Sequence, residues 1–311
     1  MLARFLRLSL LFESFAYLLL GVGLVRLSGW SPWAALLLAI VLALAGRAGV
    51  VTFSYLNAYV HRHAAGGGRG PQWQEVAREI WAFVASIFVE AFDTLLMRAD
   101  APRRVADGAH EAPLLLVHGY GCNRGYWWWL KPRLEARGRS VATLSLEPIH
   151  GDIDAYAEQI ARRVAWLRER SGAQRVTLVG HSMGGLACLA YLRRYGEDSV
   201  AKLITLGTPH RGSTAIRMAF GRNARQMEPG AAWLAELAAF FVEMPLGVPC
   251  IAYYSPQDNM VLPPGHAMRA GADNRPLDGV GHVSMGMSPR VLAELLVETD
   301  GSEKPRASSG V

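Results

Sequence analysis

Hydrophobic positions are concentrated most strongly in the first 60 residues of the chain. Residues 8–25 are apolar apart from Glu13 and a few small polar side chains, and an arginine stands at each end of the run. A helix of this length, rising about 1.5 Å per residue, just crosses a hydrocarbon core of about 30 Å. A second apolar run, residues 31–51, begins with Ser-Pro, a favourable helix start. The pattern predicts a transmembrane helical hairpin over residues 1–60.

Aromatic and charged residues indicate how such a hairpin would lie. Trp30 and Trp33 suit one membrane interface, and Arg47, near the far end of the second helix, would extend towards lipid headgroups. Arginines precede the first run and follow the second, whereas the connecting loop holds only Arg26, so both ends are expected in the cytoplasm. Two alternatives stay open, a cleaved signal peptide and helices of a soluble domain that fold back onto the rest of the chain.

Residues 61–101 join this hairpin to the remainder of the chain. Residues 61–70 are rich in glycine and histidine, which predicts a flexible linker. Residues 72–97 have helical periodicity, with carboxylates and a serine on one side and a broad apolar face on the other. The uncharged core is too short to span a bilayer. This amphipathic helix is expected either at the membrane interface or against the following domain.

From residue 102 the pattern changes to short aliphatic runs that alternate with helical stretches. Such alternation predicts an α/β protein with a mostly parallel sheet and helices on both faces. The domain is expected to cover residues 102–299, followed by a polar, disordered tail at 300–311. The predicted strands are 113–118, 141–146, 175–179, 203–206 and 248–254, and the predicted helices are 124–137, 153–170, 186–195 and 292–297.

One short stretch of this domain carries recognisable chemistry. Residues 180–185 are Gly-His-Ser-Met-Gly-Gly and stand between a predicted strand and a predicted helix. A Gly-x-Ser-x-Gly in that place is typical of a nucleophile elbow, a tight turn that exposes a serine hydroxyl. Side chains at Gly180 and Gly184 would collide with the neighbouring strand and helix. Ser182 is therefore the predicted nucleophile.

Two further stretches make the pattern more specific. Residues 118–121 are His-Gly-Tyr-Gly, and residues 205–213 are Thr-Leu-Gly-Thr-Pro-His-Arg-Gly-Ser. With residues 180–185 they resemble bacterial lipases and esterases of the α/β-hydrolase superfamily, from about residue 113 to the end of the domain. The resemblance implies the α/β-hydrolase fold. It also favours reading the apolar insertion at about 211–247 as a helical lid that lines an acyl-chain pocket, with ordinary helices packed on the sheet as the alternative.

A serine hydroxyl needs a base to remove its proton, and a carboxylate orients that base. In this fold the chain order is serine, acid, histidine. His282, in a glycine-flanked loop after the last predicted strand, is the predicted base, and Asp258, after the strand before it, is the predicted acid. The less well placed alternatives are His181, His210 and His266 for the base, and Asp273 and Asp278 for the acid.

The tetrahedral intermediate of acyl transfer carries an oxyanion that needs fixed hydrogen-bond donors. One predicted donor is the backbone N–H of Met183, directly after the nucleophile. By the resemblance, the second is the backbone N–H of Tyr120, in the loop after the first strand. His118, two residues earlier, is expected to be structural.

Composition narrows the choice of partners. The formal charge is +6, but the arginines are scattered and no nucleic-acid motif is present. An anionic membrane surface is therefore the expected partner, and nucleic acid is not. The three cysteines are far apart and lack metal-ligand spacing, so neither a disulfide framework nor a metal site is predicted. Some relatives hold a structural calcium near the histidine loop, but the sequence offers no convincing carboxylate set for it, and no cofactor is expected.

These features together predict a membrane-anchored serine hydrolase of the lipase type. It would cleave carboxylic esters, above all of lipids, through an acyl-enzyme at Ser182. The expected location is a bacterial inner membrane with the catalytic domain in the cytoplasm. The open alternatives are a short-chain esterase, thioesterase or amidase with the same triad, and a non-catalytic binding protein on the same fold.

Overall fold

The computed structural model describes residues 1–64, 69–104 and 112–300. In this part of the chain, six parallel strands form one sheet in the order β2-β1-β3-β4-β5-β6. The expected tail at 300–311 lies, apart from its first residue, outside the described residues. The strands are β1 (Leu114–Val117), β2 (Val141–Leu144), β3 (Val176–His181), β4 (Val200–Leu206), β5 (Cys250–Tyr254) and β6 (Asp273–Pro276).

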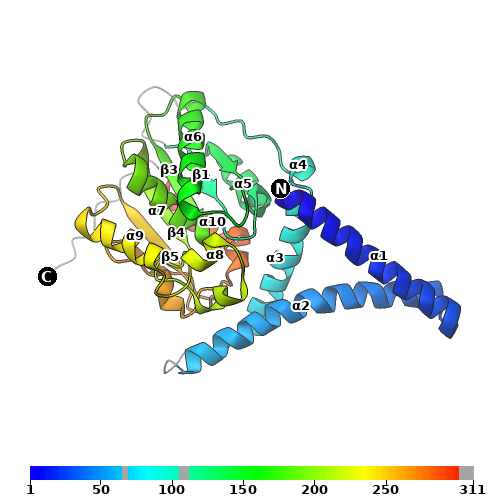
Figure 1. Cartoon of the computed structure of the whole chain (residues 1–311). Coiled ribbons are helices and arrows are strands. Elements are labelled where there is room, and N and C mark those ends of the chain that lie inside the picture. The colour runs from blue at the N-terminus through cyan, green and yellow to red at the C-terminus, as the bar shows by residue number, and fades with distance from the viewer. Residues whose placement is uncertain (65–68, 105–111, 301–311) are drawn as a thin grey trace.

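Helices cover both faces of this sheet, as the alternating pattern predicted (Figure 1). Alternate residues of the buried strands enter two separate cores: Leu115 packs with α6 and α7 on one face, and Leu116 packs with α5 and α10 on the other. Because both faces are covered, the inner strands are largely apolar. The helices of this domain are α5 (Leu130–Glu135), α6 (Ile153–Ser171), α7 (Met183–Tyr195), α8 (Arg222–Gln226), α9 (Ala232–Glu243) and α10 (Pro289–Glu298), with 3-10 turns η1 (Arg124–Trp128), η2 (Thr214–Met218), η3 (Pro264–Ala267) and η4 (Val283–Met287).

The structure differs from the sequence prediction at two elements of this domain. The helix expected over 124–137 is interrupted, because η1 ends at Trp128 and α5 begins only at Leu130. Strand β6 has no predicted counterpart. Its residues are polar and largely exposed at the edge of the sheet, so hydrophobic patterning contains no signal for it.

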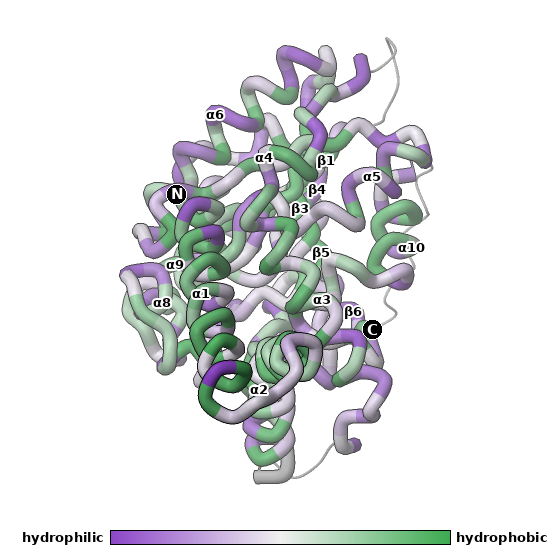
Figure 2. The backbone as a smooth tube through the Cα atoms, turned by 90° about the vertical axis from the view of Figure 1, so that its right-hand side faces the viewer, coloured by the Kyte–Doolittle hydropathy of each residue, from purple (hydrophilic) through white to green (hydrophobic). Residues whose placement is uncertain are grey.

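The N-terminal helices α1 (Leu2–Ser28) and α2 (Pro32–Ala64) form the predicted helical hairpin, which extends away from the sheet domain (Figure 1). Both are long and apolar enough to cross a membrane. They are green along much of their length in Figure 2, and most of their large side chains are exposed. Helix α2 continues to Ala64, so the predicted linker cannot begin at residue 61; residues 65–68 of that linker lie outside the described part.

Arg47 does not extend away from the hairpin as the sequence led us to expect. Its guanidinium forms two hydrogen bonds with the Glu13 carboxylate of α1, at 2.8 and 2.6 Å. The pair joins α1 to α2. Since a charge in an apolar setting is stabilised by a close opposite charge, this contact replaces the contact with headgroups.

Helix α3 (Trp73–Ala91) stands between the hairpin and the sheet domain (Figure 1). It buries its polar side and exposes large apolar side chains, the reverse of an ordinary surface helix. Its buried polar residues are Glu75, Glu79, Ser86 and Glu90. Its exposed apolar residues include Trp73, Trp81 and Phe88. Of the two positions predicted for this helix, the structure therefore shows packing against the domain, with an apolar face left uncovered.

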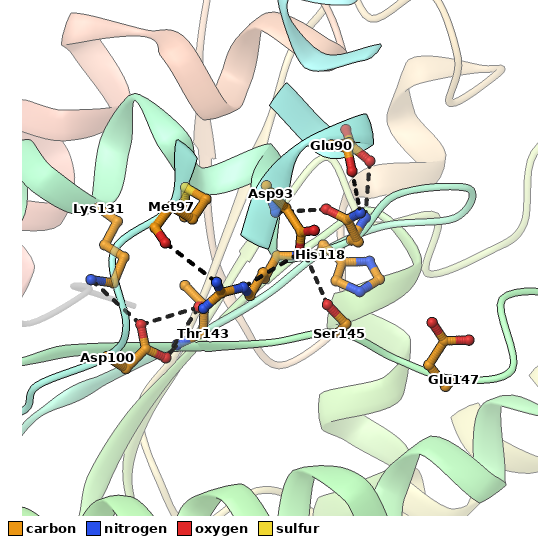
Figure 3. Close-up of polar contacts among 12 residues, drawn as sticks. Glu90, Asp93, Met97, Asp100, His118, Lys131, Thr143, Ser145 and Glu147 are labelled. Carbon is orange, nitrogen blue, oxygen red and sulfur yellow. Dashed lines mark hydrogen bonds and ion pairs between the residues drawn. The ribbon is translucent and has the colours of Figure 1, made fainter. Parts of the chain in front are cut away.

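The chain after α3 is fixed to the sheet by charged contacts (Figure 3). The short helix α4 (Asp93–Leu96) places the Asp93 carboxylate beside Arg124. Asp100 accepts the backbone N–H of Thr143 in β2 at 2.7 Å and pairs with Lys131 and Arg163. These contacts join the N-terminal helices to the domain ahead of β1.

The insertion at 211–247 has two parts with different positions. Helix α9 packs on α7, and its Leu234 and Leu237 are buried in the core. Only the earlier part, with Ile216 and Met227, reaches the cavity beside Ser182. The structure thus favours the alternative of ordinary packed helices for α9.

Candidate active site

Ser182 stands at the turn between β3 and α7, with φ 53° and ψ −125°. Among the described residues it is the one non-glycine residue with a positive φ, a conformation that costs energy and is often found at functional sites. The glycines around it allow the tight turn. A Cβ on Gly184 would lie 2.3 Å from the Val117 carbonyl oxygen, and one on Gly180 would lie 2.5 Å from Gly185. Side chains at these two positions would therefore collide with the neighbouring backbone, as the sequence predicted.

The structure brings the three predicted triad residues into hydrogen-bond contact. His282 Nε2 lies 3.0 Å from Ser182 Oγ, and His282 Nδ1 lies 2.9 Å from Asp258 Oδ2. The other oxygen of Asp258 accepts the backbone N–H groups of Met260 and Val261, both at 2.8 Å. Because an ionised carboxylate only accepts hydrogen bonds, the proton belongs on Nδ1, and Nε2 is free to accept the serine proton.

The surroundings of His282 raise its pKa above the ordinary value. Burial acts in the opposite direction, but the charge and hydrogen bond of Asp258, together with the charge of Glu79, outweigh it. A raised pKa favours the imidazolium that forms when His282 has taken the serine proton.

The alternative histidines have other partners. His181 Nε2 donates to the His282 carbonyl oxygen at 3.0 Å, and His266 Nδ1 lies 2.9 Å from the Gly212 carbonyl oxygen. Burial lowers the pKa of His210 to about 3. His118 accepts the Leu146 N–H through Nε2 and donates through Nδ1 to a neighbouring carbonyl, which is a structural arrangement.

The alternative acids are at the surface. Asp273 is exposed and pairs with Arg275, and Asp278 is exposed on the loop that follows β6. Neither lies in the hydrogen-bond chain of His282 and Ser182. Asp258 is the carboxylate in that chain.

The two predicted oxyanion donors belong to two segments that adjoin Ser182. Met183 is the first residue of α7, where helix N–H groups have no partner within the helix. Tyr120 is in the loop after β1, which passes close to the elbow: a Cβ on Gly119 would lie 3.0 Å from that of Ser182. The Tyr120 hydroxyl donates to the Phe220 carbonyl oxygen at 2.7 Å, which ties this loop to the insertion.

Ser182 and His282 line a largely apolar cavity of about 220 Å³. The predicted lid segment supplies part of the wall. Loops of the sheet domain supply much of the rest, and helices outside that domain add Leu6 of α1 and Phe83 and Ile87 of α3. The resemblance that predicted the lid does not extend to these helices, so sequence analysis did not include them in the site.

Glu79 of α3 is fully buried against the loop that carries His282. Its two carboxylate oxygens accept the backbone N–H groups of Val283 and Ser284, at 2.6 and 2.8 Å. Gly281 gives it room, since a Cβ there would lie 2.4 Å from the Glu79 carboxylate. Sequence analysis placed Glu79 on the polar side of a helix and gave it no role; the stripe of carboxylates on that helix was the available signal.

Helix α2 contributes a second support for the same loop. The Asn259 side chain accepts the backbone N–H of His282 at 3.0 Å and donates to the Ser54 hydroxyl of α2 at 2.7 Å. The backbone on each side of the predicted base is therefore held by an N-terminal helix.

Glu90 of α3 holds the loop on the oxyanion side in a similar way (Figure 3). Its carboxylate accepts the Asn123 backbone N–H at 2.9 Å, and its own carbonyl oxygen accepts the Asn123 side-chain amide at 2.8 Å. Burial raises the pKa of Glu90 to about 8. The group is therefore neutral near pH 7, and it lines the cavity.

We expect Glu90→Gln to raise the Tm at about pH 9 and to change it little at about pH 5. An ordinary glutamate loses its proton near pH 4.5, whereas Glu90 in the folded protein keeps its proton to about pH 8. Stability linked to this group is therefore fully present below pH 4.5 and is lost as pH rises through about 8. Glutamine has no such proton and still accepts the Asn123 N–H. Thermal unfolding of both proteins at the two pH values checks this, and an equal shift at both would contradict it.

Comparison with known proteins agrees with this geometry. Residues 112–240 match the family model for the alpha/beta hydrolase fold. The sheet domain also resembles a solved lipase of Bacillus licheniformis in its mature form, with a TM-score of 0.57, 18% sequence identity, and coverage of 64% of this chain and 95% of that one. The sheet domain has the α/β-hydrolase fold.

Curated relatives of this α/β-hydrolase domain include two bacterial triacylglycerol lipases. That of Burkholderia plantarii is 32% identical over 149 residues, 44% of this chain and 41% of its own length. That of Pseudarthrobacter phenanthrenivorans is 34% identical over 113 residues, 34% of this chain and 35% of its own length. The chain thus spans about two fifths or less of the length of these relatives.

The described residues contain no group of three or more His, Cys, Asp or Glu side chains that could hold a metal ion. Ser182, His282 and Asp258 form a chain of two hydrogen bonds at this site.

Proposed function

We propose that this protein is a membrane-anchored serine hydrolase that cleaves carboxylic esters of lipids. The observation that carries the proposal is the hydrogen-bonded chain from Ser182 through His282 to Asp258, which opens into an apolar cavity. The similarity to triacylglycerol lipases supports an ester as substrate.

In the first half of the reaction, Ser182 Oγ attacks the ester carbonyl carbon while His282 Nε2 takes its proton. The backbone N–H groups of Tyr120 and Met183 stabilise the oxyanion. When the carbon–oxygen bond to the alcohol breaks, the alcohol oxygen takes the proton from His282. Water then attacks the acyl-enzyme, giving one proton to His282, and the fatty acid leaves as Ser182 recovers that proton.

The form of the cavity supports a long acyl chain as part of the substrate. Leu6, Phe83 and Ile87 line both the cavity at Ser182 and a second groove that runs between α1, α2 and α3 to Arg47. We propose that an acyl chain attached at Ser182 passes these shared residues and continues between the N-terminal helices. Burial of its methylene groups contributes about 0.8 kcal/mol each.

The exposed apolar surfaces of α1, α2 and α3 support a position in and on a membrane. We assign residues 1–60 to the anchor, residues 61–101 to the connection and residues 102–299 to the catalytic domain, which we place in the cytoplasm on the distribution of arginines. Leu6 forms part of the cavity wall, which favours a retained helix α1 over a cleaved signal peptide.

The test is hydrolysis of p-nitrophenyl esters from acetyl to palmitoyl by the detergent-solubilised full chain, with Ser182→Ala as the blank. A serine-dependent rate that peaks at long chains supports the proposal. A peak at the shortest chains would indicate an esterase, and serine-dependent turnover of only thioesters or amides would change the substrate class. No serine-dependent turnover would favour a binding protein on this fold.

We expect Leu6→Trp to lower kcat/KM for the palmitoyl ester about tenfold relative to the acetyl ester. Leu6 lines both the cavity and the groove, so an indole there would block the proposed route, which a long acyl chain needs and an acetyl group does not. Leu11→Trp, at an exposed position of the same helix, is the matched control. Equal losses on both esters would exclude this route for the acyl chain.

A further inference from the structure

Ser54 of α2 makes a polar contact with the candidate active site, although its helix is apolar enough to cross a membrane. The Ser54 hydroxyl oxygen accepts the side-chain N–H of Asn259 at 2.7 Å, and the hydroxyl donates to the Val51 carbonyl oxygen at 2.7 Å. Asn259 in turn accepts the backbone N–H of His282 at 3.0 Å. A chain of hydrogen bonds therefore runs from the N-terminal hairpin to the predicted base.

This chain of hydrogen bonds has one possible direction. The backbone N–H of His282 can only donate, so the Asn259 atom opposite it is the carbonyl oxygen Oδ1. The amide nitrogen Nδ2 then faces Ser54, whose hydroxyl oxygen accepts from it. Asn259 is 3% exposed, so an unpaired Nδ2 would cost free energy. The Ser54 hydroxyl thus favours the orientation of Asn259 that also holds His282.

Asn259 directly follows Asp258, so two neighbouring side chains hold one histidine. Asp258 Oδ2 lies 2.9 Å from the imidazole Nδ1 of His282, and Asn259 Oδ1 lies 3.0 Å from the backbone nitrogen. The first contact orients the ring, and the second holds the backbone that carries it. Since reaction rates depend steeply on the placement of catalytic groups, a shift of Asn259 would affect the contact between Nε2 and Ser182 Oγ.

The next residue of α2 packs against the same loop. Tyr55 is 1% exposed, and a Cβ on Gly281 would lie 2.4 Å from its hydroxyl oxygen. Ser54 and Tyr55 therefore bring α2 directly against the residues around His282. Close packing at Gly281 leaves the loop little room, so a displacement of α2 would displace the loop as well.

We propose that Ser54 is a positioning residue for the catalytic base and acts through Asn259. The inference rests on the serine hydrolase function proposed above. It gives the N-terminal hairpin a part in catalysis as well as in anchoring, because the hydroxyl belongs to a proposed membrane span. Ser54 and Asn259 are not among the described residues that line the cavity, so the effect should fall on kcat and leave KM nearly unchanged.

The experiment measures hydrolysis of p-nitrophenyl butyrate by the full chain in detergent. Each rate is divided by the number of active sites, which is titrated to completion with a fluorophosphonate. We expect Ser54→Ala to lower kcat per active site about tenfold, by displacing the base. Thr52→Ala removes a hydroxyl from an exposed position of the same helix and should leave kcat unchanged.

A pair of variants with nearly equal shape isolates the hydroxyl. Ser54→Thr retains it and should retain most of kcat, whereas Ser54→Val lacks it and should lose about as much as Ser54→Ala. This comparison stands even where Ser54→Ala is not recovered in folded form. Equal kcat per active site in the threonine and valine variants would overturn the inference.

A double-mutant cycle tests the route through Asn259. If Ser54 acts through Asn259, adding Ser54→Ala to Asn259→Ala should lower kcat per active site less than about twofold further. Losses that multiply would show that the two residues act independently, which contradicts the inference.

A purely structural role for Ser54 would give a different result. Ser54→Ala would then lower the fraction of sites that titrate and leave kcat per active site at the wild-type value, and the inference would be wrong. In that case Ser182-dependent hydrolysis by the wild type still leaves the proposed function intact. Absence of Ser182-dependent hydrolysis by the wild type would instead refute the proposed function.

Discussion

Ser182→Ala is expected to lower kcat for ester hydrolysis at least about 10⁴-fold, the scale seen when a triad nucleophile is removed. Alanine retains the Cβ and removes only the oxygen that His282 Nε2 contacts at 3.0 Å. The turn with φ 53° should persist, because Gly180, Gly184 and Gly185 and the packing around them are unchanged. The measurement is initial rates over a range of ester concentrations.

Two controls separate lost chemistry from lost structure. The Tm of Ser182→Ala should equal or exceed that of wild type, and labelling by a fluorophosphonate probe should disappear. His282→Ala and the double variant with Ser182→Ala should be about as inactive as Ser182→Ala alone, since the residues act as a unit. Retained labelling in Ser182→Ala would mean that another nucleophile is present.

Glu79→Ala is expected to have the second largest effect, a fall in kcat of about 100-fold. The substitution leaves the buried N–H groups of Val283 and Ser284 without their acceptor, directly after the predicted base. The loop should shift to satisfy them, and a displacement of about 1 Å at a reacting group can cost this much. Arg78→Ala, adjacent but exposed, is the matched control.

The pH profile of Glu79→Gln tests whether Glu79 acts through its charge, because a purely structural role would leave that profile unchanged. His282 must be neutral to accept the serine proton, so activity falls as pH is lowered through its raised pKa. The charge of Glu79 contributes to raising that pKa, while burial raises the pKa of Glu79 itself against its hydrogen bonds from Val283 and Ser284. Removing its charge should therefore shift the acid limb of the kcat/KM profile to lower pH, with the loop largely retained. An unmoved acid limb would show that Glu79 is protonated over that pH range and acts on position alone.

Helix α3 contacts both the N-terminal hairpin and the loops of the candidate active site. One side of the helix places Glu79 at the histidine loop and Glu90 at the oxyanion loop, while its other side exposes Trp81 and Phe88. The same element thus supports both ends of the site and presents an apolar surface. In the function that we propose, one helix would serve both anchoring and catalysis.

The sequence by itself determined the elements whose signal is local. Buried parallel strands such as β1 and β3 are continuous apolar runs, and the turn at Ser182 requires glycines at fixed positions. The fold in turn fixes the order of nucleophile, acid and base, so Asp258 and His282 could be chosen, and the structure brings both within hydrogen-bond distance. Their catalytic roles stay predictions until the variants are measured.

Only the tertiary structure decided what covers the site and what holds it. Glu79 reaches the loop after His282 across 204 residues of chain, and no periodicity specifies the partner of a buried carboxylate at that separation. Strand β6 was not predicted, because an exposed edge strand does not need apolar residues. The cavity wall came from α1 and α3 as much as from residues 211–247. The amphipathic pattern shows which side of a helix is polar. Whether that side is buried depends on the domain packed against it.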